Sequence, residues 1–438
     1  ELSSEDSVSG QSAVSRRIKE LRLRLGLSQA QVARPEFTDS YLSLIESGQR
    51  APTPRVLEVI ARKLNCSVEY LLHGVESEEI RRLEHDLQAA RAALESGNKE
   101  EARSLYQRLV AEPEISRLPD HLYSAKYGLA LTVEACGDLD EAIRMLVELR
   151  THHRDSLNDE LRIGSALALT RCYRDRGDFE LAAQTAENEI AAMIEKGWTD
   201  HLIELGATLM SVYYERGDLL RAEQYATQLI AAAEKLGTPR AIVATNWNAA
   251  IVAEMLGKKE EALERIERAW KIQAVIGDPR NRARLHLAYL DLRLRIRPQE
   301  AAECREELLS ETEHELRNSA ASTLDLAFCY YLLCRAEIEL GQTESAIRYG
   351  RKAIDLLGDT YSGIYADCHV VLAKAYQMSG RDDDAVGALN TAAEALANEE
   401  KNRMTAEVWL MAAEVWQALG DQEKSREAFQ RAMEFSGV

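Results

Sequence analysis

The sequence predicts an all-α protein, in which a small N-terminal domain of five short helices precedes a right-handed solenoid of about nine helix pairs. Helix-breaking residues are rare, since 23 Gly and 8 Pro make up 31 of 438 residues, about 7% against ~12% in average proteins. Aromatic residues, which strands favour, make up only 6% of the chain. A turn signal that recurs along most of the chain predicts the helix pairs.

The first 75 residues contain a polar tail and then the five short helical patterns. Residues 1–12 are polar and rich in Ser, so we expect a disordered tail. The predicted domain over 13–75 follows, where Ser28, Thr38 and Pro54 are placed to begin helices. The helical patterns cover 14–25, 28–33, 38–47, 54–64 and 68–72.

The charge is distributed unevenly between this domain and the rest. Residues 13–75 carry ten Lys and Arg against six Asp and Glu, a net charge of +4. Residues 76–438 carry 44 against 64, a net charge of −20. A basic module can face a polyanion that would repel the acidic body. The alternative is that +4 is a chance excess on a small domain.

Residues 76–438 contain a periodic turn signal, a Gly followed five residues later by a small residue. Five of these turns are spaced by 40 residues each. The Gly ends one helix with a positive φ, and the small residue lets the next helix pack closely. Arg297-Pro298 occupies one slot without a Gly, with Ala302 in register. The turn glycines are Gly97, Gly137, Gly177, Gly217, Gly257, Gly341, Gly380 and Gly420.

The repeat unit resembles the tetratricopeptide repeat. A Tyr precedes the turn Gly by four residues in three units, and Trp416 takes that place in the last unit. The family's second-helix Ala recurs seven residues after the small residue. These residues are Tyr173, Tyr213 and Tyr376, and Ala269, Ala353, Ala392 and Ala432. The alternative is an unrelated helical array such as HEAT.

The segments Leu27-Ser28-Gln29 and Ile45-Glu46-x-Gly48-x-Arg50-x-Pro52 resemble the helix-turn-helix domain of the Xre/Cro/phage-repressor family. The resemblance implies that the helix over 39–46 enters the major groove of double-stranded DNA. Arg34-Pro35-Glu36-Phe37 departs from the family by replacing its usual turn with one that is a residue shorter. The candidate DNA-binding residues are Gln29, Thr38, Asp39, Ser40, Tyr41, Ser43, Arg50 and Arg55.

Three of the residues in this domain have alternative interpretations. Asp39 either accepts from a cytosine amine or only supports the helix N-terminus. Tyr41 either contacts DNA or packs on the surface of the domain. Glu46 is expected to form an internal salt bridge, with Arg16 or Arg17 as its partner.

The tetratricopeptide resemblance also implies a ligand groove. In that family the first-helix residues three and six before the turn Gly line the concave face. Their Arg and Lys side chains suit the carboxylates of a short peptide, and Asn side chains suit its backbone. The alternative is that the charged residues pair with one another and that Asn248 only packs. The candidate ligand-binding residues are Arg171, Arg174, Tyr214, Asn246, Trp247, Asn248, Arg335 and Lys374.

The sequence contains no catalytic, phosphate-binding or metal-binding motif, so we expect no enzyme, no cofactor and no metal. Seven scattered cysteines without a C-x-x-C pair predict reduced thiols in a cytoplasmic protein. No segment approaches the ~20 apolar residues of a membrane helix, so no membrane partner is expected.

The two resemblances together are typical of the peptide-responsive RRNPP-type regulators of Gram-positive bacteria, which act in quorum sensing. They imply a homodimeric, DNA-binding transcription regulator whose repeats, over 76–438, dimerise and bind a signalling peptide or partner protein. Trp409, Trp416 and Phe429 are candidates for the dimer interface. The alternative is a repeat scaffold or protein-binding regulator whose helix-turn-helix module does not read DNA.

Overall fold

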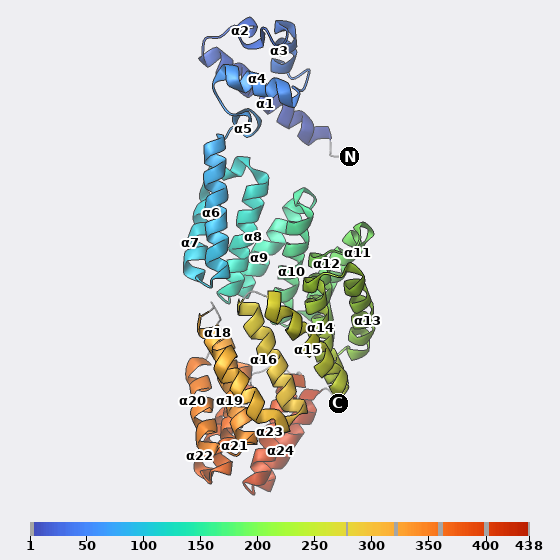
Figure 1. Ribbon diagram of the computed structural model, residues 1–438, viewed down its shortest axis with the longest axis vertical. Helices are drawn as coiled ribbons and strands as arrows, with labels where there is room; N and C mark the ends of the chain where they lie inside the picture. Colours follow the sequence, from blue (N-terminus) through green and yellow to red (C-terminus); the bar gives the residue numbers. More distant parts are fainter. Residues whose placement is uncertain (1–3, 277–278, 319–322, 358–361, 398–402, 437–438) are drawn as a thin grey trace. The chain divides into compact units, whose positions relative to one another are not determined.

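The computed structural model describes residues 4–276, 279–318, 323–357, 362–397 and 403–436. All regular secondary structure in these ranges is helical, which confirms the predicted fold class (Figure 1). The chain divides into two compact units, Glu1–Leu161 and Arg162–Val438. Within the described ranges, no helix combines the length and the apolar character that crossing a membrane requires.

One long helix and four shorter ones build the N-terminal head, which comprises the residues from Ser4 to Gly74. Four of them begin at side-chain caps, because the hydroxyls of Ser28, Thr38, Thr53 and Ser67 each accept a hydrogen bond from the backbone N–H three residues on. The helices are α1 (Ser4–Arg24), α2 (Gln29–Ala33), α3 (Asp39–Glu46), α4 (Pro54–Leu64) and α5 (Val68–His73).

The structure differs from the prediction at the N-terminus. Residues 1–12 were expected to be a disordered tail, but α1 begins at Ser4; residues 1–3 lie outside the described residues. No proline interrupts the chain before Arg24. A helix that has already nucleated therefore extends through the polar segment, since each added residue gains a hydrogen bond without a second nucleation.

The residues before and after Gly74 belong to two separate hydrophobic cores. Ile18, Leu42 and Ile45 are fully buried in the core of the head, which ends with Leu71. Val75 already belongs to the next core. The core therefore changes between Leu71 and Val75, and the compact unit continues beyond this point to Leu161 and includes the first helix pairs.

The helices that follow the head in the first unit form two pairs. Tyr106 from the first pair is buried against the backbone of Gly128 in the second. A short 3-10 helix, η1 (Ile115–Arg117), connects the pairs. The pairs are α6 (Ser77–Glu95) with α7 (Lys99–Ala111), and α8 (Pro119–Ala135) with α9 (Leu139–His153).

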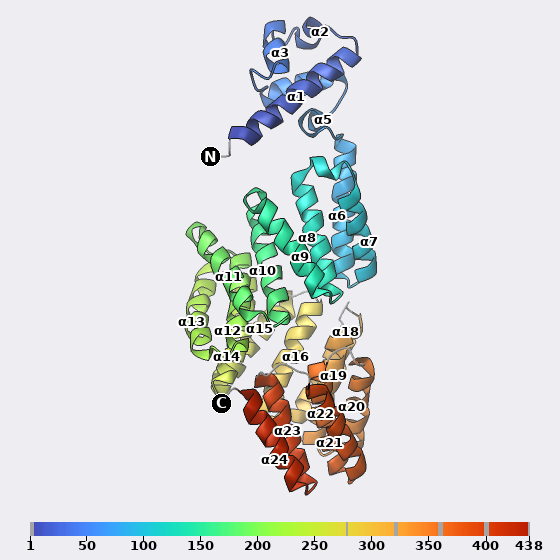
Figure 2. The same ribbon diagram turned by 180° about the vertical axis from the view of Figure 1, so that it is seen from behind.

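The remaining helices repeat this pairing, as the sequence predicted (Figure 2). Gly217 shows how a turn works: its φ is +85°, which ends one helix, and Ala222 is fully buried where the next helix packs. The pairs are α10 (Asp159–Asp175) with α11 (Phe179–Met193), α12 (Asp200–Glu215) with α13 (Leu219–Leu236), α14 (Pro239–Met255) with α15 (Lys259–Ile276), α19 (Thr323–Glu339) with α20 (Thr343–Leu357), α21 (Ser362–Met378) with α22 (Asp382–Leu396), and α23 (Arg403–Ala418) with α24 (Gln422–Ser436).

The pair without a turn Gly is irregular. A 3-10 turn, η4 (Pro298–Glu300), follows α16 (Pro279–Ile296). The predicted register was wrong here, because Ala301 is buried and Ala302 is exposed. Because the 3-10 turn is tighter, the residue that faces inward comes one position earlier in the chain than expected. The second helix of the pair then continues as α17 (Ala301–Glu307), a π-helical turn, η5 (Leu308–Thr312), and α18 (Glu313–Asn318).

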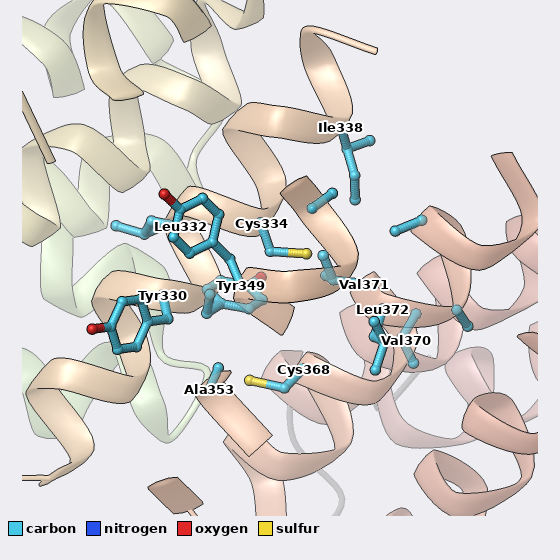
Figure 3. Packing of buried hydrophobic residues seen from close by; sticks show 14 of the residues in the cluster. Tyr330, Leu332, Cys334, Ile338, Tyr349, Ala353, Cys368, Val370, Val371 and Leu372 are labelled. Atoms are coloured by element: carbon cyan, nitrogen blue, oxygen red, sulfur yellow. The ribbon is translucent and has the colours of Figure 1, made fainter. Parts of the chain in front are cut away.

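The largest core of the second unit lies around α19, α20 and α21. Figure 3 shows Tyr330, Cys334 and Cys368 among its aliphatic neighbours. Cys334 and Cys368 are both buried, and burial raises the pKa of the Cys334 thiol to about 12. All seven cysteines of the chain lie in the described ranges and are free thiols, as predicted.

Candidate functional sites

The helix expected to enter the major groove, α3, has one buried face and one exposed face. Leu42 and Ile45 point into the core of the head. Thr38, Ser40 and Ser43, all predicted DNA contacts, are exposed on the opposite face. Thr38 also caps the helix by accepting a hydrogen bond from the Tyr41 backbone N–H at 3.2 Å. The local sequence therefore sets both the start of α3 and the face that it offers.

Glu46 at the end of α3 forms an internal salt bridge, but its predicted partner was wrong. Arg22 is the partner, with Nε 2.5 Å from Oε1 and Nη2 2.9 Å from Oε2. Arg17 instead donates to the backbone carbonyl of Leu71 at 2.9 Å. The inward-facing position of α1, where Ile18 is also buried, recurs four residues later at Arg22.

Two of the predicted DNA-binding residues already have partners inside the head. Gln29 Nε2 donates to Glu46 Oε2 at 2.9 Å. The guanidinium of Arg50 stacks over the ring of Tyr41, 4.9 Å from the ring centroid. Burial alone would raise the pKa of Glu46, but the hydrogen bonds from Arg22 and Gln29 lower it below its ordinary value. Arg55 is exposed in the first turn of α4.

Two further residues of this face were not identified from the sequence. Arg34, which follows the last residue of α2, donates to the carboxylate of Asp39. Leu44 of α3 is 38% exposed, so an apolar side chain lies beside the exposed serines. The signal for Leu44 was present, because it lies on the face opposite the buried Leu42 and Ile45. Arg34 lies in the segment that departs from the family pattern, and its sequence position gives no sign of the contact with Asp39.

The candidate groove residues in the first part of the second unit form a local cluster. Arg174 Nη1 donates to the Ser211 hydroxyl at 2.9 Å, and its Nε lies 3.7 Å from Glu215 Oε1. Tyr214 is half-buried beside them. Burial raises the pKa of Glu215 to about 7. Arg171, on the same helix, is half-buried.

Asn246, Trp247 and Asn248 do not form one surface. The Asn246 side chain is 1% exposed and its Nδ2 donates to the Ile242 carbonyl at 2.9 Å, while its buried Oδ1 has no hydrogen-bond partner in the described residues. Asn248 Nδ2 donates to the carbonyl of Ala244 at 3.0 Å. Trp247 is partly buried against the core around α14 and α15. Both Asn amides thus bond to the backbone of their own helix.

Arg335 lies in a ladder of ion pairs that crosses three helices. Its Nη1 donates to Asp291 Oδ1 at 2.8 Å, and Asp291 Oδ2 lies 3.0 Å from Arg295. Arg295 in turn donates to Glu254 at 2.8 Å. Pairing of groove charges with one another, the alternative kept from the sequence, is therefore what the structure contains at Arg335. Lys374 is exposed on α21.

Asp367 extends this ladder, although its position thirteen residues before Gly380 lay outside the two positions marked by the resemblance. Burial raises its pKa to about 6, against the favourable effects of a Tyr331 hydrogen bond and of Arg335. The Oδ1 atom of Asp367 is buried without a hydrogen-bond partner in the described residues. The folded state thus favours the protonated carboxyl.

This raised pKa predicts a pH-dependent effect of Asp367→Asn. The ordinary pKa is 3.8, so from about pH 4 to pH 6 the carboxyl is ionised in the unfolded state before it is ionised in the folded state. The free energy of unfolding therefore falls as the pH rises from about 4 to above 6. The variant should be more stable than the wild type at pH 8, by on the order of 2 kcal/mol. The difference should shrink at pH 4.5, as measured by urea unfolding. Asp291→Asn, which removes the negative charge between Arg335 and Arg295, should destabilise at both pH values. An Asp367→Asn effect that does not change with pH would contradict the assignment.

Comparisons with known proteins agree with this architecture. A helix-turn-helix family model matches residues 18–71, and a tetratricopeptide repeat model matches residues 86–114. Neither of these families is enzymatic.

Three solved structures share 14% sequence identity with the chain. A Rap protein complexed with Competence and Sporulation Factor has a TM-score of 0.52, covering 81% of this chain and 98% of that chain. The apo form of RapI has a TM-score of 0.50, covering 81% and 97%. PlcR of Bacillus thuringiensis, in complex with the peptide PapR7 and DNA, has a TM-score of 0.42, covering 64% and 99%. The likeness to the Rap proteins concerns the fold. The chain joins an Xre-type helix-turn-helix domain to a tetratricopeptide-repeat body, a pairing that resembles the RRNPP-type regulators.

Proposed function

We propose that the protein is a DNA-binding transcription regulator of the cytoplasm, in which the helix-turn-helix head reads DNA and the repeat body dimerises and senses a short signalling peptide. The observation that carries the proposal is the placement of α3. Its apolar face is locked into the core of the head by Leu42 and Ile45, while Ser40 and Ser43 remain exposed. A helix held in this way can enter the major groove with its N-terminal side chains against base edges.

The charge of the head supports DNA as the partner. The net charge of +4 over residues 13–75 contrasts with −20 for residues 76–438. Phosphate contacts supply much of the affinity of such domains and make binding depend on salt. We assign contacts with the DNA backbone to two exposed residues. Arg50 follows the end of α3, and Arg55 lies in the first turn of α4.

The peptide is supported by the half-buried polar groups of the second unit. The cluster around Arg174 and Tyr214 and the ladder around Arg335 offer both signs of charge on first helices of the pairs. A short peptide carries an ammonium, a carboxylate and a polar backbone, each of which needs such partners when it is desolvated.

The last helix pair supports the proposed homodimer. Phe429 and Met433 of α24 are 37% and 63% exposed, and Leu410 of α23 is 41% exposed. Trp416 is instead buried within the pair, with the Lys424 ammonium over its ring. We therefore assign the interface to Phe429 and its exposed neighbours, and a packing role to Trp416. A dimer places two heads on two half-sites, so a ligand that changes their spacing changes affinity.

A repeat scaffold that does not read DNA is the second candidate function. The observation that favours it is that Gln29 and Arg50, two expected DNA contacts, already have partners in Glu46 and Tyr41. Deletion of residues 1–75 distinguishes the two functions. It should abolish DNA binding by a regulator and leave the partner of a scaffold bound.

Selection from a random duplex pool by the full-length protein tests the proposed function. We expect enrichment of a two-fold symmetric site. Arg50→Ala should weaken binding to all sequences and reduce the salt slope by about one, because one phosphate contact is lost. Ser40→Ala should instead change the preferred bases. Absence of any enriched site at low salt, with and without added peptide, would favour the scaffold.

A further inference from the structure

We propose that Arg34 reads a guanine in the major groove, and that Asp39 holds the Arg34 guanidinium in position for this contact. The proposal rests on the proposed function, since DNA must be the ligand of the head. It extends base recognition beyond α3 to the end of α2. It also assigns a role to the segment in which the sequence departs from the helix-turn-helix pattern.

The contacts between the two side chains define which edge of the guanidinium is used. Arg34 Nε donates to Asp39 Oδ1 at 3.3 Å, and Nη2 donates to Oδ1 and Oδ2, both at 3.2 Å. The carboxylate thus occupies the edge formed by Nε and Nη2. In the described part of the chain, no acceptor is bonded to Nη1. The edge formed by Nη1 and the outer N–H of Nη2 remains available.

This available edge matches guanine. The guanidinium presents its donors in a fixed planar fork, so that occupying one edge orients the other. Two parallel N–H groups can donate to O6 and N7 of guanine, the pair of acceptors that only guanine shows in the major groove. A side chain that is already held by a neighbour loses less conformational freedom when it binds.

Two hydrogen bonds hold the backbone of Arg34 in place, and this fixes the position of its Cα and Cβ atoms. The Arg34 N–H donates to the Ala30 carbonyl at 3.0 Å, and the Arg34 carbonyl accepts from Lys63 Nζ at 3.1 Å. Asp39 is the first residue of α3, the part of a recognition helix that contacts base edges. The Arg34 side chain is 69% exposed and that of Asp39 is 42% exposed. Both are therefore accessible to a duplex docked on α3.

The ion pair with Arg34 also offsets the repulsion between the Asp39 carboxylate and the DNA phosphates. Its own backbone hydrogen bond at the helix start, and then the hydrogen bond from Arg34, hold the pKa of Asp39 below its ordinary value. An ionised carboxylate near phosphates would repel DNA, unless it accepts from a cytosine amine. With Arg34 across it, the carboxylate is neutralised, and the group presented to the bases is a donor.

A duplex in which guanine lacks one acceptor tests this assignment. The full-length protein and its Arg34→Ala variant would be titrated with the selected operator, in which each guanine in turn is replaced by 7-deazaguanine. This base retains pairing with cytosine but lacks N7. At one guanine in each half-site, the wild type should lose affinity by roughly 10-fold, because the hydrogen bond to N7 is lost while O6 still accepts one. The Arg34→Ala variant should show little further loss there.

Two matched variants separate base reading from other effects. Asp39→Asn should weaken the preference for the same guanine, since the amide holds the guanidinium less firmly. Arg81→Ala removes one exposed Arg outside the head and should leave every base preference unchanged. Because the Arg34 pair is exposed, its loss should leave the head folded, which hydrogen exchange of residues 13–50 would verify.

The outcomes distinguish this inference from the proposed function. If Arg34→Ala weakens all sequences equally, as expected for Arg50→Ala, Arg34 contacts phosphate and the inference is wrong. If it leaves the sensitivity to 7-deazaguanine unchanged, another residue reads the guanine and the inference is also wrong. If the wild type selects no site at all, the proposed function fails and the inference fails with it.

Discussion

Gly128→Ala should destabilise the first unit by about 3 kcal/mol, the upper part of the range for overpacking a buried site. A Cβ at Gly128 of α8 would overlap ring carbons of Tyr106 and would lie 2.6 Å from its hydroxyl oxygen. Tyr106 is only 4% exposed and its ring is rigid, so it cannot yield without displacing its neighbours. Urea unfolding, combined with hydrogen exchange of residues 99–135, measures the loss.

The chain contains a matched control for this substitution. Gly387 lies within α22, and a Cβ there would meet no atom within 4 Å. Gly387→Ala should therefore stabilise the second unit by about 0.5–1 kcal/mol, because Ala favours the helix over Gly. Gly128→Ala in a Tyr106→Ala background should cost much less than in the wild type. A stabilising effect of Gly128→Ala by itself would show that Tyr106 does not pack over this glycine.

Arg22→Ala should destabilise the head by about 3–5 kcal/mol, as expected when one partner of a buried ion pair is removed. Arg22 and Glu46 are 8% and 9% exposed, so the remaining carboxylate would be left in the core without its main partner. Arg22 also donates to the carbonyl of Leu27 at 2.8 Å, which fixes the chain between α1 and α2. Hydrogen exchange of residues 13–50 should show faster exchange in the variant.

Two controls make the Arg22 prediction specific. Arg24→Ala removes an exposed Arg two residues away and should have little effect. The double variant Arg22→Met, Glu46→Leu removes both charges and should recover most of the lost stability, because no unpaired charge remains. The wild-type pair should also weaken in acid, since a carboxyl with a lowered pKa loses its contribution as the pH falls through that pKa. Equal losses in the single and double variants would argue against the ion pair.

The sequence predicted those features that depend on a few neighbouring residues. Ser28 and Thr38 cap helices at the positions expected from their hydroxyls. Gly217 has the positive φ expected at its turn, and Ala222 packs as the small residue should. A cap or a turn is complete within about five residues, so the local pattern is sufficient to predict it.

The candidate sites depend on contacts between residues that are far apart in the sequence. Arg335 pairs with Asp291, which precedes it by 44 residues. The register of the pair without a turn Gly also changed by one residue, from Ala302 to Ala301, because a 3-10 turn replaced the glycine turn. The period of the repeat determines neither how two helices are rotated relative to each other nor how many residues an irregular turn contains.

The sequence by itself determined the all-α class, the helix-turn-helix head and the paired repeats, because periodic apolar residues, caps and glycine turns act within single units. Only the tertiary structure decided which charges meet. In the folded protein, Glu46 pairs with Arg22, Asp39 pairs with Arg34, and Asp291 pairs with Arg335. The physical reason is that the long Arg side chain reaches acceptors on other helices, and the choice among them depends on how those helices are rotated and packed.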